Sequence, residues 1–110
     1  MYGFPATPGT YGDTPEPSGI AAFVARFSAD LASLEWAAAF GGRDGDLVFD
    51  LALDPQDRPV VVGATDSRDY PTTPGAVDRQ CNDSDEWYSC PGVHDGFATK
   101  LTADGSGLVW

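Results

Sequence analysis

The sequence predicts an all-β protein built from antiparallel four-stranded units, of which the chain holds about one and a half. Three observations lead to this prediction. A proline-bracketed phrase occurs twice, as FPATPG at residues 4–9 and as YPTTPG at residues 70–75. A longer run, at residues 22–36, recurs at residues 96–110. Apolar residues also alternate along short segments with the two-residue period of a strand.

The recurring runs define one repeated unit with an insertion in its second copy. The long runs are offset by 74 residues (22 to 96), whereas the phrases are offset by 66 residues (4 to 70). The difference, 74 − 66 = 8 residues, falls on the segment that contains both cysteines. Insertions in repeat proteins fall in surface loops, so we expect a surface loop there.

In the first copy, residues 22–27 are expected to form a strand that is followed by a turn and a second strand. The turn at residues 30–32 aligns with residues 104–106, and Leu31 stands where the second copy has Gly105. An Asp-Gly pair tolerates positive φ and favours a hairpin. Since the first copy lacks this glycine, we expect its turn to differ in conformation.

Residues 29–40 also permit a helix. Leu31, Leu34 and Ala38 fall at helical spacing, and alanine is the best helix former. The aligned residues 103–110 read ADGSGLVW, and their glycines disfavour a helix. Because two copies of one unit should share one fold, we favour a strand.

The second unit supplies three strands and the start of a fourth. Apolar residues alternate along residues 47–53, and the DPQD turn follows at residues 54–57. The β-branched run at residues 58–65 predicts a strand that is buried on both faces. After a long polar segment come a strand at residues 97–101, an Asp104-Gly105 turn, and a fourth strand that begins at residues 108–110.

Four strands joined up and down by tight hairpins describe a propeller blade. We interpret residues 1–44 as the C-terminal half of one blade repeat, with a loop and two strands. Residues 45–110 form most of the next blade repeat, with the cysteine-containing loop inserted at about residues 77–94. Since Met1 is followed at once by mid-repeat sequence, we expect a piece of a longer gene product. Its uncovered blade faces predict neighbouring blades in a longer chain or self-association.

Composition and charge argue against several classes of function. The 110 residues carry a net charge of −11, which repels nucleic-acid phosphates and anionic membrane surfaces. No apolar stretch approaches the roughly 20 residues of a membrane-spanning helix. The first residues lack the basic and apolar regions of a signal peptide. We expect no nucleic-acid partner and no membrane insertion.

The two cysteines, Cys81 and Cys90, bracket the polar run CNDSDEWYSC. Zinc needs about four nitrogen or sulfur ligands, and nothing in the sequence resembles such a set. We favour a disulfide, which would stabilise the loop by roughly 2–3 kcal/mol and imply an oxidising compartment. Two unpaired surface thiols are the alternative.

Acidic residues in two places make calcium a weak candidate cofactor, and no other cofactor is expected. The candidate ligands inside the cysteine loop are Asp83, Asp85 and Glu86, and a second acidic group occupies residues 43–46. Calcium takes six to eight oxygen ligands, but neither segment has the spacing of a helix-loop-helix calcium loop. Solvated acidic loops are the alternative.

Trp87 and Tyr88 lie between the cysteines and are candidate ligand contacts, because aromatic residues on a constrained loop often contact partners. The alternative, which we favour, is that they fold back and cover the blade. We identify no catalytic residue. His94 is the only histidine, and no nucleophile motif accompanies it, so we expect a protein that is not an enzyme.

The order of these motifs resembles the bacterial β-propeller repeat (SBBP) family. The resemblance covers nearly the whole chain and departs from the family at the cysteine-containing insertion and at Leu31. The matching elements are Gly41-Gly42 with Asp46, the strand at residues 47–53, the turn at 54–57, Val61–Gly63, the phrase at 70–76, the strand at 96–101, and Asp104-Gly105.

The resemblance implies a repeat module of secreted or surface-anchored bacterial proteins and provides no shared catalytic residues. We therefore expect an extracellular or cell-surface location and a role in protein or glycan binding. A purely structural spacer within a larger protein is the alternative, and part of a secreted hydrolase is a third, more distant one.

Overall fold

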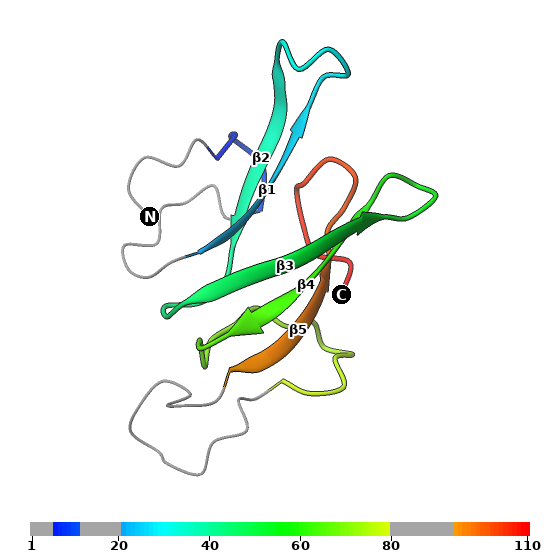
Figure 1. Ribbon diagram of the computed structural model, residues 1–110. Helices are drawn as coiled ribbons and strands as arrows, with labels where there is room; N and C mark the ends of the chain where they lie inside the picture. The colour runs from blue at the N-terminus through cyan, green and yellow to red at the C-terminus, as the bar shows by residue number, and fades with distance from the viewer. Residues whose placement is uncertain (1–5, 12–20, 80–93) are drawn as a thin grey trace.

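The computed structural model describes residues 6–11, 21–79 and 94–110, and these ranges contain no helix. They contain five antiparallel strands in two sheets (Figure 1). The expected all-β class is confirmed at this level. The first sheet pairs β1 (Ala22–Phe27) with β2 (Leu34–Phe40), and the second has the order β3 (Asp46–Leu53), β4 (Pro59–Thr65), β5 (Asp95–Lys100).

The fourth strand that was expected to begin at residues 108–110 is present only as a short pairing with the end of β5. Leu101 and Leu108 form an isolated antiparallel bridge. The Lys100 N–H donates to the Trp110 carbonyl and the Val109 N–H donates to the Lys100 carbonyl, both at 2.7 Å. Within the described ranges, no helix could cross a membrane.

The alanine-rich run at residues 34–40 is a strand, as favoured, and not a helix. It pairs with β1 in a register that places Ala22 opposite Phe40 and Ala25 opposite Ala37. Trp36, Ala38 and Phe40 are all buried. Pairing and burial therefore outweigh the helix propensity of alanine, which is a weak preference that tertiary contacts override.

The turn between β1 and β2 is fixed by two side chains. The Leu31 N–H donates to the Ser28 carbonyl at 2.9 Å, and the Ser28 N–H donates to the Ser33 carbonyl at 2.9 Å. The Ser28 hydroxyl donates to Asp30 Oδ1 at 2.6 Å, and the same carboxylate accepts the Ala32 N–H at 3.0 Å. Leu31 lies at φ 60°, which is uncommon for a residue with a Cβ atom.

The turn at residues 102–107 repeats this pattern bond for bond, so the expectation that the two turns differ is wrong. The Gly105 N–H donates to the Thr102 carbonyl at 3.0 Å, and Gly105 lies at φ 71°. The Thr102 hydroxyl donates to Asp104 Oδ1 at 2.7 Å, which also accepts the Ser106 N–H at 3.0 Å. The hydroxyl and the carboxylate, which both copies share, impose the conformation without the glycine.

The second sheet is twisted and irregular at one point. β3 pairs with β4 in a register that shifts between Val48 and Asp50, as a β-bulge does. The expectation that residues 58–65 are buried on both faces is wrong at Val62, whose side chain is 42% exposed. Among the described residues, nothing covers that face of the sheet at Val62.

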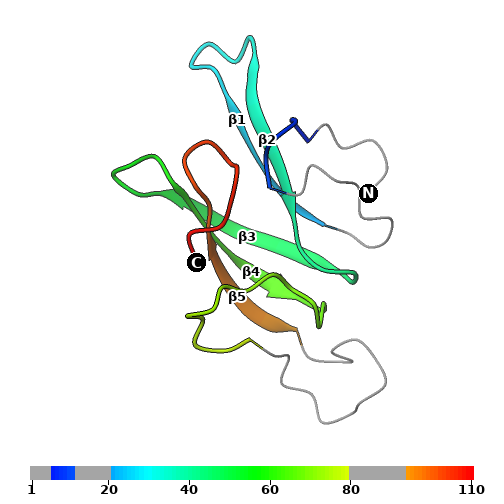
Figure 2. The ribbon, with the colours of Figure 1, turned by 180° about the vertical axis from the view of Figure 1, so that it is seen from behind.

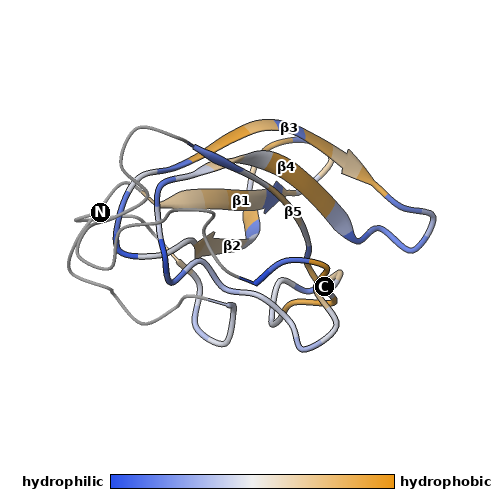
Figure 3. Ribbon diagram, turned by 90° about the horizontal axis from the view of Figure 1, so that it is seen from below, coloured by the Kyte–Doolittle hydropathy of each residue, from blue (hydrophilic) through white to orange (hydrophobic). Residues whose placement is uncertain are grey.

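One hydrophobic core joins the two sheets. Figure 2 shows the β1-β2 hairpin crossing the second sheet, and Figure 3 shows hydrophobic colouring on the strands and hydrophilic colouring on the turn between β3 and β4. The buried apolar residues of this core come from both sheets: Ala22, Val24, Trp36, Ala38 and Phe40 from the first, and Val61 with the adjacent Leu101 from the second.

Trp36 contacts the turn of the second unit. A Cβ atom on Gly105 would lie 2.7 Å from Cε3 of Trp36, so only glycine fits beside the ring. The Gly105 carbonyl accepts the Tyr11 N–H at 2.7 Å. Figures 1 and 2 show this turn, in orange and red, rising beside the β1-β2 hairpin. The glycine is therefore required by packing between the units.

The aligned strands β1 and β5 bury opposite faces. In β1, Ala22 and Val24 are buried, whereas their counterparts in β5, Gly96 and Ala98, are exposed. Conversely, Thr99 is buried in β5. We call the Thr99 side of a unit its front and the Ala98 side its back. The front of the second unit thus packs on the back of the first.

Candidate functional site

The residues selected from the sequence as site candidates lie outside the described ranges. This applies to the proposed disulfide, the calcium ligands and the aromatic contacts, so these stay predictions. They are Cys81, Cys90, Asp83, Asp85, Glu86, Trp87 and Tyr88.

His94 lies at the surface beside an acidic residue. Its Nδ1 is 2.5 Å from Oδ1 of Asp66; the His94 side chain is exposed and that of Asp66 is partly exposed. The Asp66 N–H donates to the Gly45 carbonyl at 2.8 Å. This contact therefore lies where the loop that follows β4 meets the start of β5.

Asp46, one of the acidic residues at 43–46, has a structural role. Its carboxylate is buried and accepts hydrogen bonds from the Thr65 hydroxyl, from the Gly42 N–H at 2.8 Å and from the Ser67 hydroxyl at 3.2 Å. Burial raises the pKa of Asp46. A Cβ atom on Gly41 would collide with this carboxylate, and one on Gly42 would collide with Ser67 and Asp69, which explains the Gly-Gly pair before the strand. Within the described part of the chain, no three acidic, histidine or cysteine side chains form a metal-binding group.

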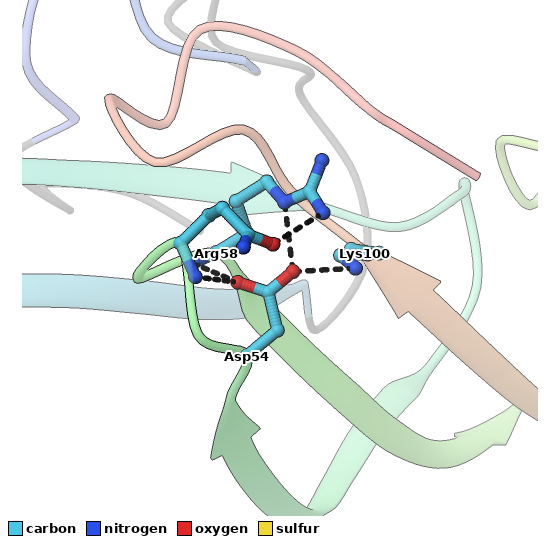
Figure 4. Close-up of polar contacts among 4 residues, drawn as sticks. Asp54, Arg58 and Lys100 are labelled. Atoms are coloured by element: carbon cyan, nitrogen blue, oxygen red, sulfur yellow. Dashed lines mark hydrogen bonds and ion pairs between the residues drawn. The ribbon is translucent and has the colours of Figure 1, made fainter.

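A second carboxylate ties the turn between β3 and β4 to β5 (Figure 4). Asp54 Oδ2 lies 2.6 Å from Nζ of Lys100 and 2.8 Å from Nε of Arg58. The Lys100 ammonium group holds the pKa of Asp54 well below its usual range, with further help from the Arg58 N–H. Asp54 Oδ1 also accepts the N–H groups of Gln56 and Arg58 at 2.9 Å each. This cluster holds the turn between β3 and β4 against the end of β5. Both carboxylate oxygens of Asp54 are bonded within the cluster.

A groove of about 580 Å³ lies between β5 and the loop that carries the second proline phrase. Thr73, Thr99 and Trp110 are among the residues that line the groove. Tyr70 and Phe97 are stacked in the groove with ring centroids 4.5 Å apart. The Tyr70 hydroxyl and the Thr99 hydroxyl lie within hydrogen-bonding distance, at 2.7 Å, and burial raises the pKa of Tyr70.

The groove was not found from the sequence, although a signal for it was present. Thr73 and Trp110 align with Thr7 and Trp36 of the first copy, so the duplication already pointed to equivalent surroundings. The groove offers apolar rings, hydroxyls and a strand edge. These features suit binding of a polypeptide.

Comparison with known proteins returns no match: no family model, no curated protein and no solved structure matches this chain.

Proposed function

We propose that the chain is a non-catalytic repeat module of β-propeller type whose units stack front to back and which acts in protein binding in a secreted or cell-surface bacterial protein. The proposal rests on the observation that the aligned strands β1 and β5 bury opposite faces. The same strand of the unit is covered on its back in the first copy and on its front in the second. This is how repeated units stack on one another.

A front-to-back contact leaves one complementary face open at each end of the pair. Such contacts are heterologous, and they generate rings or filaments when further copies are added. On the open front of the first unit, Phe27 is 51% exposed, whereas its counterpart Leu101 is 0% exposed. On the open back of the second unit, Val62 is 42% exposed, and Leu47, which pairs with Ala64 on the same side, is 48% exposed.

These exposed residues favour protein binding over glycan binding and over a purely passive spacer. Burying one such apolar side chain is worth roughly 1.5–3 kcal/mol. Large apolar areas on sheet faces are typical of contacts with another protein. The partner favoured by this surface is a sibling unit, in the same chain or in another copy.

Sedimentation velocity over a range of protein concentrations tests the proposal. In physiological salt, which screens the net charge of −11, the sedimentation coefficient should rise with concentration. Phe27→Ser should shift this association to concentrations about 10- to 100-fold higher, since it removes an exposed ring that the association would bury.

Leu31→Ser is the matched control. Leu31 is apolar and 76% exposed but lies on the turn rather than on a sheet face, so its replacement should leave association unchanged. A folded monomer at every concentration, or equal effects of both variants, would contradict the stacking role. Circular dichroism verifies that each variant is folded.

A further inference from the structure

β3 forms one edge of the second sheet, and part of its backbone faces away from β4. Among the described residues, β3 pairs only with β4. The Asp54 N–H donates to the Arg58 carbonyl at 3.1 Å, so the backbone groups of Asp54 point towards the side of β4. Orientation alternates along an antiparallel strand. The backbone groups of Ala52 therefore also point to β4, whereas those of Leu51 and Leu53 point outward.

The contacts of Pro59 agree with this orientation. Pro59 is the register partner of Leu53, but its carbonyl accepts the Leu101 N–H at 2.9 Å, on the β5 side. Proline also has no N–H to donate. The backbone groups of Leu53 therefore border the outer edge of the sheet.

The side chains along this edge are apolar and exposed. Residues 47–53 read LVFDLAL, with six apolar residues, one aspartate and neither proline nor glycine. Phe49 is 71% exposed, Leu51 is 44% exposed and Leu53 is 60% exposed. Short segments with high β propensity, low net charge and no proline pair readily with other strands. Figure 3 shows the end of β3 projecting beyond β1 and β2. Units that stack front to back would cover the faces of this sheet and not its edge.

One side chain blocks this edge. The Leu51 N–H, which points outward, donates to Oδ1 of Asp50 at 2.8 Å. The carboxylate therefore lies over the edge and occupies a donor that an added strand would need. Asp50 is exposed and is the only charged residue between Leu47 and Leu53. The register also shifts between Val48 and Asp50, and bulges and charged side chains are the means by which edge strands avoid pairing.

We propose that Asp50 guards the edge of β3 against pairing with β3 of a second copy of this chain. The occupant is a second copy because β3 is self-complementary: in antiparallel pairing of β3 with itself, apolar side chains meet apolar side chains. The exception is Asp50, because the pairing would bring two aspartates close together, and like charges across paired strands are destabilising. Such a contact is isologous and closes at two copies.

This inference concerns a sheet edge and does not rest on the stacking of units proposed above. The two can fail separately, because front-to-back stacking adds copies without limit whereas edge pairing stops at a dimer. Phe27→Ser, which weakens stacking, is therefore the background for every variant below. If the chain does not stack, the background protein is still the monomer from which edge pairing is measured.

The test is sedimentation velocity of Asp50→Val in physiological salt, which screens the net charge. Valine suits a strand, and it removes the carboxylate and frees the Leu51 N–H. This variant should form a dimer at concentrations at least about tenfold below those at which the background protein does. Amide hydrogen exchange at Leu53 should slow as the dimer forms, because its N–H would bond to the second copy.

Three further variants separate the effects of the carboxylate. Asp44→Val is the matched control, because it removes the same charge from the loop before β3 and should not cause dimers. Asp50→Asn removes the charge but keeps an oxygen that accepts the Leu51 N–H, so it should dimerise more weakly than Asp50→Val. Ala52→Asp, added to Asp50→Val, returns a carboxylate to the same side of β3 and should restore the monomer.

An Asp50→Val variant that is monomeric at every concentration overturns the inference, as does equal dimerisation of Asp44→Val. Species larger than a dimer, or a dimer in which exchange at Leu53 is unchanged, would show that the copies meet elsewhere than at the edge of β3. Either result also overturns it. Circular dichroism verifies that each variant is folded.

Discussion

The turns at residues 28–33 and 102–107 have similar backbones and share their main hydrogen bonds, to which the Ser106 hydroxyl adds a bond to Asp104 at 2.7 Å, but their surroundings are opposite. Gly105 lies against the ring of Trp36, whereas Leu31 projects into solvent with 76% of its surface exposed. Both residues have positive φ, at 71° and 60°. A glycine at a turn can be needed for two reasons: its backbone adopts positive φ, and it has no side chain. The comparison separates these two reasons. Here the shared hydroxyl and carboxylate set the conformation, and packing between units decides where glycine is needed.

The largest effect is expected at the two tryptophans, which occupy equivalent positions in different surroundings. Trp36 is 8% exposed and Trp110 is 46% exposed. Trp36→Ala should lower the free energy of unfolding by about 3–5 kcal/mol, because it leaves a cavity in the core. Trp110→Ala should cost less than about 1 kcal/mol, as is usual for a residue outside the core. Urea denaturation measures both.

Trp36→Phe is a useful control for this pair. The Nε1 group of Trp36 is buried and has no hydrogen-bond partner among the described residues. Phenylalanine keeps a ring in the core and removes this unsatisfied donor, so it should cost much less than alanine. Equal destabilisation by Trp36→Ala and Trp110→Ala would show that the two units do not pack as described.

Exchanging the turn residues tests the comparison directly. Gly105→Leu should lower the free energy of unfolding by about 3 kcal/mol, since its Cβ atom collides with Trp36. Leu31→Gly should raise it by about 1 kcal/mol, because it relieves a left-handed conformation and removes no packed side chain. Thermal unfolding of the two variants and the wild type measures the difference. A stabilising Gly105→Leu would contradict the assigned contact.

The repeat and its strands could be predicted from the sequence because they depend on local patterns. The alternation along residues 47–53 and the match between residues 22–36 and 96–110 reflect the strands themselves. The turn at Leu31 was predicted wrongly because glycine was taken as the cause of its conformation. That inference overlooked the hydroxyl of Ser28 and the carboxylate of Asp30, which sufficed.

The groove and the buried core partners of each strand depend on how the units stack, which no local pattern records. Val62 illustrates this. It belongs to a β-branched run, a pattern that predicts burial, but it is exposed because no described residue covers that face of the sheet. The groove could have been inferred only by carrying the surroundings of Thr7 over to Thr73 after the duplication was found.

The smallest expected effect concerns acid. Hydrogen bonds from Ser106 and then Thr102 lower the pKa of Asp104 from 3.8 to about 2, and a hydrogen bond from Ser28 lowers that of Asp30 in the same way. A lowered pKa in the folded state means that the unfolded state binds more protons in this range. The contribution to stability is therefore complete above about pH 4 and is lost as the pH falls towards about 2.

Asp30→Asn and Asp104→Asn should each flatten the fall in stability across this window, and Asp104→Asn should do so more, because the Ser106 hydroxyl also donates to Asp104 whereas Ala32 has no hydroxyl to donate to Asp30. Midpoints of urea unfolding measured at a series of pH values test this. A flattening seen for one variant only would show that the turns differ in solution.

Because the aligned strands β1 and β5 bury opposite faces, an assembly of these modules has a different exposed face at each of its two ends. Each copy that is added to such a row covers one exposed apolar face and adds another exposed face of the same kind. The row therefore always ends in an uncovered apolar face. Only two geometries avoid this: closure of the row into a circle, or an end piece whose outward side is hydrophilic.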